Sequence, residues 1–347
     1  MNINTQEIKE LLFSLSGIMS VSGGEKLFTH KLKELTQGLF DEYEEDPNGG
    51  HIFIKRADFA TKGKLLIDAH FDEIGFMVTD ILEGGFLAVT NIGGINTRIL
   101  PAARIYVYGK ETIPAYFAST PPHLRKKGEG GNAPTLSSLL LDTGMDTATL
   151  KETVSVGTLC GFASAPAELM ADCVCGHGFD NKACCTAAIM GVAAADRSKM
   201  KYDVYLHLAG REEVGCVGGR TGAYSIDPDI AIVLDVEFAS MPGVREDKTV
   251  KRGKGPSLTV SPVCDKRLTD NIADIAKECG IDYQTIVYSM RTGTDTDTVN
   301  ITASGIPCAL MGIPLSGMHT AEETVCLRDI EAAAKLIAEF AERGEKE

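Results

Sequence analysis

Apolar residues near the start of the chain recur with helical spacing. One face of a segment that begins at residue 5 carries Ile8, Leu11, Leu12 and Leu15, and this i, i+3, i+4, i+7 pattern predicts an amphipathic helix. Residues 20–40 begin with Ser and Gly and then repeat the spacing, which predicts a second helix with an apolar stripe of Leu27, Leu32, Leu35 and Leu39. The next apolar segments, HIFIKR (51–56) and KLLIDAH (64–70), are bounded by turns and predict strands.

Residues 74–162 have a different pattern, in which short β-like runs alternate with Gly and Pro turns. The runs read GFMVTDIL, GFLAVTNIG, RIYVYG and TIPAYFAS, and between or after them lie a Gly- and Lys-rich loop, KKGEGGN, and a short helical piece, TATLKET. Many short strands with turn residues between them are typical of a small barrel or sandwich. We therefore expect a separate small β domain here.

Strands and longer helices alternate in the rest of the chain. Helices are predicted at 180–196, 269–280 and 328–343, and strands at 202–210, 229–236 and 306–313. Such alternation indicates an α/β sheet that is buried on both faces. We predict an α/β fold with an open mixed sheet flanked by helices, formed by residues 1–73 and 163–347, and a β-barrel-like domain inserted as residues 74–162.

Composition narrows the functional classes. The 347 residues include 34 basic and 48 acidic side chains, a formal net charge of -14, which argues against nucleic acid or an anionic membrane as a partner. The N-terminal sequence MNINTQEIKELLF lacks the features of a signal peptide, and no apolar run approaches the length of a membrane span. We expect a cytoplasmic protein.

The ten cysteines are scattered, mostly within apolar segments such as CCTAAIM and IPCALMG, so we predict that they are reduced and buried. A thiolate zinc site is the alternative for one cluster, formed by Cys173, Cys175 and His177 with Cys184 and Cys185 nearby. Its spacing fits poorly, because structural zinc sites usually contain CxxC-type pairs with longer separations.

Metal-binding residue types follow several of the apolar runs. His70 and Asp72 form an HxD pair after a strand, and the others are Asp180 in GFDNK, Glu212 and Glu213 in REEVG, Asp235 closing IAIVLD, and His319 in SGMHTAEE. In open α/β sheets the ligand binds at the carboxyl ends of the strands, so one edge of the sheet could collect these side chains. Their order and context together indicate a dinuclear metallohydrolase.

The chemistry of such a site suggests a role for each residue. Two divalent ions need a bridging carboxylate, for which Asp180 is the natural candidate. His70 and Asp235 could complete the coordination of one ion, and Glu213 and His319 that of the other. These mixed N and O ligands suit Zn, Co or Mn. Glu212 is then free to act as a general base.

Asp72 follows His70 closely enough to accept the second N–H of its imidazole and fix its tautomer. A backbone carbonyl could accept that N–H instead, and Asp72 could merely cap a turn.

In these motifs the chain resembles the glutamyl and tetrahedral aminopeptidases, a family of dinuclear metallopeptidases that includes members labelled endoglucanase. Nearly the whole chain shares the resemblance, in the strings DAHFDEIGFMV, NIGGINTRILPAARIYVYG, STPPHLR, GFDNKACC, REEVGCVGG, PDIAIVLDV, GKGPSL, RTGTDTDT and GMHTAEETV. It implies a zinc-peptidase-like fold whose metal ligands are His70, Asp180, Glu213, Asp235 and His319.

The resemblance also implies an activity and an assembly. Glu212 would be the general base, Asp72 would be the supporting carboxylate beside His70, and two Zn or Co ions per subunit, or Mn, would assist hydrolysis of the N-terminal peptide bond. Peptides would be the substrates. The inserted domain would mediate dimerisation, and dimers would assemble into a hollow tetrahedral dodecamer.

Two strings depart from the family pattern. NKACC follows the predicted bridging Asp, and GTDTDT stands where GTDA is usual, which adds Asp297 near the expected substrate pocket. Arg291 and Asp295 are our candidates for residues that shape the S1 pocket.

Other functions are compatible with parts of this pattern. An amidase, deacylase or carboxypeptidase can use the same dinuclear site, although REEVG and GTD favour the aminopeptidase. A non-catalytic metal-bound scaffold would be marked by a lost base or ligand, whereas all six residues are present here. Glycoside hydrolysis uses two opposed carboxyl groups without metal, so we expect an endoglucanase label to be wrong.

Overall fold

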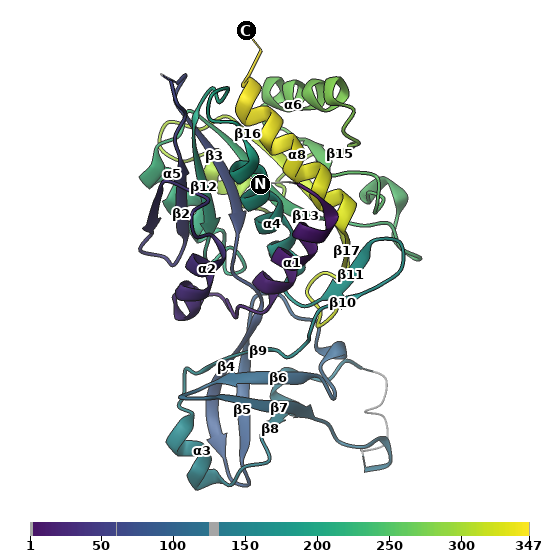
Figure 1. The fold of residues 1–347 in the computed structure, drawn as a ribbon. Coiled ribbons are helices and arrows are strands. Elements are labelled where there is room, and N and C mark those ends of the chain that lie inside the picture. The colour runs from purple at the N-terminus through teal and green to yellow at the C-terminus, as the bar shows by residue number, and fades with distance from the viewer. Residues whose placement is uncertain (1–2, 60, 125–131, 347) are drawn as a thin grey trace.

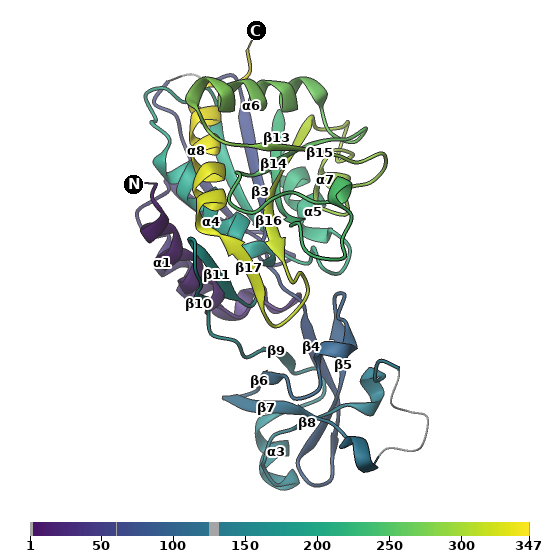
Figure 2. The ribbon, with the colours of Figure 1, turned by 90° about the vertical axis from the view of Figure 1, so that its right-hand side faces the viewer.

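The computed structural model describes residues 3–59, 61–124 and 132–346. The predicted KKGEGGN loop lies outside these residues except for its last position, Asn132. Two parts are visible in Figures 1 and 2: a large α/β part that contains both termini, and a smaller β barrel below it. The predicted class, a mixed α/β sheet with an inserted barrel, is confirmed.

The described part of the chain forms an eleven-stranded mixed sheet in the larger part. Along its main path the order is β1-β2-β12-β3-β13-β16-β17-β11-β10, and β14 and β15 branch from β16. The four central strands, β12, β3, β13 and β16, are parallel, so their carboxyl ends share one edge. The bounds are β1 Glu42–Glu45, β2 His51–Lys55, β3 Lys64–His70, β10 Ala167–Glu168, β11 Cys173–Gly176, β12 Asp203–Ala209, β13 Ile230–Phe238, β14 Ser257–Val260, β15 Gln284–Val287, β16 Cys308–Ser316 and β17 Glu323–Cys326.

Helices cover both faces of this sheet. One face packs against α1 (Thr5–Ser16), α4 (Phe179–Ala194), α6 (Lys266–Cys279) and α8 (Leu327–Arg343), and the other against α5 (Val217–Ile226) and α7 (Thr296–Val299). Successive residues of β3 alternate between the two cores, because side chains along a strand point to opposite faces. Leu65 and Ile67 enter the first core and Leu66 enters the second.

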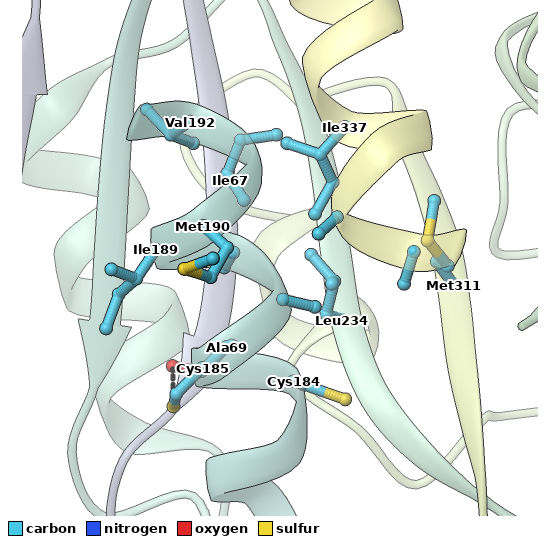
Figure 3. Close-up of a cluster of buried hydrophobic side chains, with 14 of the residues drawn as sticks. Ile67, Ala69, Cys184, Cys185, Ile189, Met190, Val192, Leu234, Met311 and Ile337 are labelled. Carbon is cyan, nitrogen blue, oxygen red and sulfur yellow. Dashed lines mark hydrogen bonds between the residues drawn. The ribbon is translucent and has the colours of Figure 1, made fainter. Parts of the chain in front are cut away.

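The first core forms where α4 and α8 lie against the central strands. Figure 3 shows Ile189, Met190 and Val192 of α4 and Ile337 of α8 facing Ile67, Leu234 and Met311 of the sheet. Each of these side chains is at most 1% exposed. This packing fixes the position of α4 along the strands. It therefore places the start of that helix near the carboxyl ends of the strands.

The predicted helix over residues 20–40 is wrong in its length and in part of its stripe. A 3₁₀ turn, Glu25–Phe28, precedes a short α2, Thr29–Leu35. Leu27 is 57% exposed, and Leu39 lies beyond the helix. The cause is Glu25, which is buried and accepts hydrogen bonds from the backbone of Gly23 and Arg211. These bonds tie the start of the segment to a distant loop, and the helix begins only after it.

The smaller part is a closed six-stranded barrel in the order β4-β5-β8-β7-β6-β9. Its interior follows the period of two expected of strands: Ile113, Ala115 and Phe117 point inward, whereas their neighbours in the strand are more exposed. Closure removes open sheet edges. The bounds are β4 Gly75–Leu82, β5 Phe86–Ile92, β6 Arg104–Tyr108, β7 Thr112–Ala118, β8 Leu140–Asp142 and β9 Leu159–Phe162, with α3 (Thr147–Thr153) where the TATLKET helix was predicted.

Within the described residues, every helix is too short or too polar to span a membrane.

Candidate metal centre

The candidate ligands meet at the carboxyl edge of the parallel strands. His70 is the last residue of β3, Glu212 and Glu213 follow β12, and His319 lies in the loop between β16 and β17. Asp180 stands in the first turn of α4. Asp235 does not close its strand as predicted, because β13 continues to Phe238 alongside β16.

Asp180 lies between two groups of side chains. Its Oδ1 atom is 3.3 Å from Nε2 of His70, and its Oδ2 atom is 3.3 Å from Nε2 of His319. His70 Nε2 is also 3.6 Å from an oxygen of Asp235, and His319 Nε2 is 3.4 Å from an oxygen of Glu213. In each group the three ligand atoms lie within 4.8 Å of one another. Two clusters that share one carboxylate have the form expected of a dinuclear centre.

The charges in the centre favour cations. Burial opposes ionisation of Asp180, but its hydrogen bonds with His319 and His70 outweigh this effect and lower its pKa. Hydrogen bonds to Asp180 and Glu213 raise the pKa of His319 to about 11. Burial raises the pKa of Asp235, so this carboxylate needs a positive neighbour to stay ionised. The donor set, imidazole nitrogens and carboxylate oxygens, fits divalent ions such as Zn²⁺.

A backbone carbonyl group orients the imidazole ring of His70. Its Nδ1 atom donates to the carbonyl oxygen of Asp72 at 3.0 Å and is 3.5 Å from the Asp72 carboxylate. A proton on Nδ1 leaves Nε2, the atom that faces Asp180 and Asp235, with a free lone pair for a metal. Of the alternatives open from the sequence, the backbone carbonyl makes the shorter contact.

The carboxylate of Asp72 instead holds the loop that carries Glu212 and Glu213. Its two oxygens accept the backbone N–H groups of Glu212, at 2.9 Å, and Glu213, at 3.2 Å. Glu25 accepts the preceding N–H, that of Arg211, at 3.0 Å. Arg211 has a positive φ of 61°, so two carboxylates from distant segments stabilise an unusual turn.

Glu323 holds the backbone on the other side of the centre, at Asp180 and His319. This residue of β17 is 1% exposed, and its carboxylate accepts the backbone N–H groups of Asp180 and His319, both at 3.0 Å. His319 also has a positive φ, of 59°. One buried side chain therefore sets the backbone position of the shared Asp180 and of one histidine.

Glu212 lies beside the two clusters and belongs to neither among the described residues. Burial raises its pKa to about 8. The thiol of Cys216 donates to Oε1 of Glu212 at 3.1 Å, which restricts the carboxylate to one orientation. A carboxylate that is adjacent to a metal cluster but outside it can exchange a proton with water there.

The centre opens into a cavity of about 470 Å³. Gly94, from the loop that follows β5 of the barrel, is part of its wall, and a Cβ atom at Gly94 would lie 3.2 Å from Nδ1 of His319. The barrel part thus reaches the site. The other lining residues are His70, Asp180, Glu212, Glu213, Cys216, Asp235, Val236, Glu237, Phe238, Tyr288, Thr292, Gly293, Thr294, Leu310, Gly312, Met318 and His319.

The two candidate S1 residues flank this cavity without lining it. Arg291 is exposed, and Asp295 is buried next to Gly219. Between them, Thr292, Gly293 and Thr294 do form part of the wall. Asp297 accepts hydrogen bonds from Thr292 and Gly293 and so shapes that loop.

Sequence reasoning missed several buried acidic residues that matter here. Glu25, Glu237 and Glu323 are each at most 5% exposed. In the sequence SGGEK and AEETV look like polar, solvated turns, and Glu237 follows the predicted end of the strand over residues 229–236. AEETV was among the strings that carry the family resemblance, and this was the only available signal for Glu323.

All ten cysteines are free, as predicted. Burial is confirmed for Cys160, Cys184, Cys185, Cys308 and Cys326, and the other five are half-buried. Cys184 and Cys185 belong to α4 and are buried in the first core (Figure 3), whereas Cys173 lies opposite Cys326 on the neighbouring strand. Cysteine is absent from both candidate metal groups in the described chain, so the thiolate zinc alternative gains no support.

Known proteins resemble this chain over most of its length. Residues 49–336 match the M42 glutamyl aminopeptidase family. The chain is 30% identical to the lysyl aminopeptidase of Pyrococcus furiosus, with 94% of each chain covered. It also superposes on the TET aminopeptidase of a marine sediment Thaumarchaeota archaeon with a TM-score of 0.92, at 26% identity and covering 99% of this chain and 98% of that one. A Thermotoga maritima structure titled endoglucanase has a TM-score of 0.78 at 27% identity, covering 96% and 97%.

Proposed function

The chain belongs to the M42 glutamyl aminopeptidase family of peptide hydrolases, and on this basis we propose that it removes N-terminal residues from peptides with a dinuclear metal centre. In this proposal His70, Asp180 and Asp235 hold one divalent ion, and Asp180, Glu213 and His319 hold the other. Zn or Co is the expected metal, and Mn is an alternative.

The observation that carries the proposal is the position of Asp180. Its two oxygens face different histidines at equal distances of 3.3 Å, and each histidine has a further carboxylate next to it. When bound, the two ions would polarise the scissile carbonyl and activate a water molecule.

Glu212 is the proposed general base. It accepts a proton from the attacking water and returns it to the nitrogen of the leaving peptide. Cys216 and the backbone bonds to Asp72 hold Glu212 in position, and the cavity encloses the group while one side remains open to substrate. A free N-terminal amine, bound among the carboxylates beside the second ion, restricts cleavage to one residue at a time.

The competing activities on such a centre differ in substrate. A deacylase or carboxypeptidase would act on N-acylated or C-terminal residues, and the family match favours the aminopeptidase. The endoglucanase title of the Thermotoga structure does not suit this cavity, because glycosidases use two opposed carboxyl groups whereas four carboxylates gather here around two histidines. A scaffold without activity would not need to retain Glu212.

For the barrel, residues 74–162, we propose a role in dimerisation and further assembly of the chain into a tetrahedral dodecamer. TET aminopeptidases form large oligomers, and a structure of PhTET1 is described as a dodecamer. Tyr106 and Tyr116 are 42% and 47% exposed on neighbouring strands of the barrel, as suits an interface with a second copy. Mass photometry would separate dimer from dodecamer.

The activity is tested with metal-stripped protein reloaded with Zn²⁺ or Co²⁺. Aminoacyl-p-nitroanilides and matched free and N-acetylated peptides are supplied, and E212Q serves as the matched variant. We expect activity only with metal and only on free N-termini, and we expect E212Q to bind metal but lose at least ~10²-fold in kcat. Cleavage confined to N-acylated substrates would replace the proposal with a deacylase, and metal binding without any cleavage would favour the scaffold.

A further inference from the structure

A fifth carboxylate lines the cavity, and the proposed chemistry does not use it. Glu237 lies two residues after Asp235 on β13, and the period of two along a strand places both side chains on the same face of the sheet. We propose that Glu237 selects substrates whose N-terminal residue has a cationic side chain, lysine or arginine. This inference rests on the proposed aminopeptidase function.

The surroundings of Glu237 leave one oxygen available for a ligand. Oε1 accepts hydrogen bonds from the Tyr288 hydroxyl, at 2.7 Å, and from the backbone N–H of Phe238, at 2.9 Å. For Oε2, the described residues provide no hydrogen bond. Tyr288 also lines the cavity, so the tyrosine fixes the carboxylate from one side while its second oxygen can receive a donor from the substrate.

Gly312 of β16 provides the space for this side chain. A Cβ atom at Gly312 would lie 2.8 Å from Cβ of Glu237 and 2.5 Å from Oγ of Ser257, closer than real side chains approach each other. Gly312 is itself part of the cavity wall. The sequence therefore combines an acidic residue on β13 with the one residue type on β16 that leaves it room.

The charge balance of the cavity favours a cation at this point. Asp180, Glu212, Glu213 and Asp235 carry four negative charges when ionised, and two divalent ions balance them. Glu237 adds a negative charge, and neither Lys nor Arg is found among the residues that line the cavity. Glu237 would repel a substrate with an acidic side chain at this point, whereas an ammonium or guanidinium group would form a charge-assisted hydrogen bond with it.

The size and lining of the cavity suit a long basic side chain. Asp235 and Glu237 are separated by about 6.6 Å along the strand, comparable to the reach of an extended lysine. Leu310 and Met318 contribute apolar wall, against which an aliphatic stem can pack while its charged end meets a polar group. A volume of about 470 Å³ can accept one such residue.

The test compares lysyl and norleucyl p-nitroanilides, which share an aliphatic stem and differ in the terminal ammonium. We expect kcat/KM for lysine to exceed that for norleucine by about 10- to 100-fold, the usual effect of a hydrogen bond to a charged group. E237Q keeps the shape and the acceptor for Tyr288 but removes the charge, and it should bring the ratio close to one. E246Q removes an exposed acidic charge that does not line the cavity and should leave the ratio as in the wild type.

Two further measurements separate the possible outcomes. Y288F keeps the carboxylate and should keep most of the lysine preference. In the catalytically silent E212Q protein, L-lysinamide should raise the melting temperature more than L-norleucinamide does, and the E212Q/E237Q double variant should not distinguish them.

Turnover of norleucine with no lysine preference, a preference that survives E237Q, or a preference for glutamate would overturn the role of Glu237 and leave the aminopeptidase proposal standing. Failure to cleave any substrate with a free N-terminus would instead overturn the proposed function, and this inference with it.

Discussion

The two halves of the candidate centre are built in different ways. The inner half, His70 and Asp235, stands on the central strands β3 and β13, and its side chains are 3% and 10% exposed. The outer half, Glu213 and His319, stands on loops, and the side chain of His319 is 35% exposed. Asp180 belongs to both halves.

This difference shows how a fold can place ligands with and without regular structure. Backbone hydrogen bonds between β12, β3, β13 and β16 fix the inner half. The outer half has no such ladder, and the carboxylates of Asp72 and Glu323 hold its backbone instead. Because buried carboxylates without cationic partners are costly, the loops and the metal should depend on each other more than the strands and the metal do.

Removal of the shared ligand should have the largest effect, because it damages both halves. D180N replaces one charged bridging oxygen with an amide nitrogen, which cannot bind a metal cation. We expect loss of at least one ion per subunit and a fall in kcat/KM of about 10³-fold or more, since metal ions supply several kcal/mol of transition-state stabilisation. Elemental analysis and p-nitroanilide kinetics measure this, and full metal content in D180N would contradict the shared role.

A buried histidine on β12, the strand next to β3, should make the free energy of unfolding depend on pH. His207 of β12 lies between Asp68 and Asp46 at 2.7 and 2.9 Å. Burial opposes its charge, but the two carboxylates outweigh this and raise its pKa to about 9. The charged form therefore stabilises the fold fully below pH ~6.5, the pKa expected of the unfolded chain, and this contribution is lost as the pH rises through about 9.

The effect is measured by urea unfolding of metal-free protein between pH 6.5 and 9.5. The shift in pKa corresponds to about 3 kcal/mol, and H207Q should make the decline in unfolding free energy shallower by about this amount. Part of the decline should remain in H207Q, because the raised pKa values of His319 and Glu212 also contribute to it. The control H30Q changes an exposed histidine and should keep the decline. An equally steep decline in H207Q would show that other groups cause it.

Loosening the outer half should weaken metal binding more moderately. E323Q keeps one acceptor but turns an amide N–H₂ group toward the second backbone N–H, so either Asp180 or His319 loses its bond. We expect a 10- to 100-fold loss of metal affinity, as is usual for groups that orient ligands. Calorimetric titration with Zn²⁺ measures it. E322Q, a change at the exposed neighbouring residue, is the control. Equal affinities of the two variants for Zn²⁺ would show that Glu323 does not support the metal ligands.

The smallest expected effect is a difference between the two halves in the rate at which they release Zn²⁺. A chelator reaches the outer half more easily, because His319 is more exposed than His70, so we expect two phases of Zn²⁺ release whose rates differ by about tenfold, a difference of ~1.4 kcal/mol in barrier height. A zinc-sensitive dye follows the release. H319A should lose the fast phase, and a single phase for the wild type would mean that the two halves are equivalent.

The positions of the inner ligands follow from the sequence more directly than those of the outer ligands. An apolar run such as KLLIDAH identifies a strand, and its last residue, His70, is then placed by the geometry of parallel sheets. Asp235 was found in the same way, although β13 continues past it. Strand pairing is regular, so the positions of these residues follow from a pattern that is visible in the chain.

The supporting residues could not be foreseen, because their roles depend on tertiary contacts alone. Glu25 contacts the backbone of Arg211, 186 positions away, and Glu323 contacts Asp180, 143 positions away. In the sequence a buried glutamate in a glycine-rich string looks the same as a solvated one. The same limit explains why the helix over residues 20–40 was predicted too long, since its start is displaced by the burial of Glu25.

We propose above all that two metal ions share Asp180, and anomalous diffraction from crystals of the zinc-loaded protein can test this. We expect two peaks about 3.5–4 Å apart, one beside His70 and Asp235 and the other beside Glu213 and His319, with Asp180 between them. A single peak, or peaks at the cysteines in place of this edge of the sheet, would contradict it.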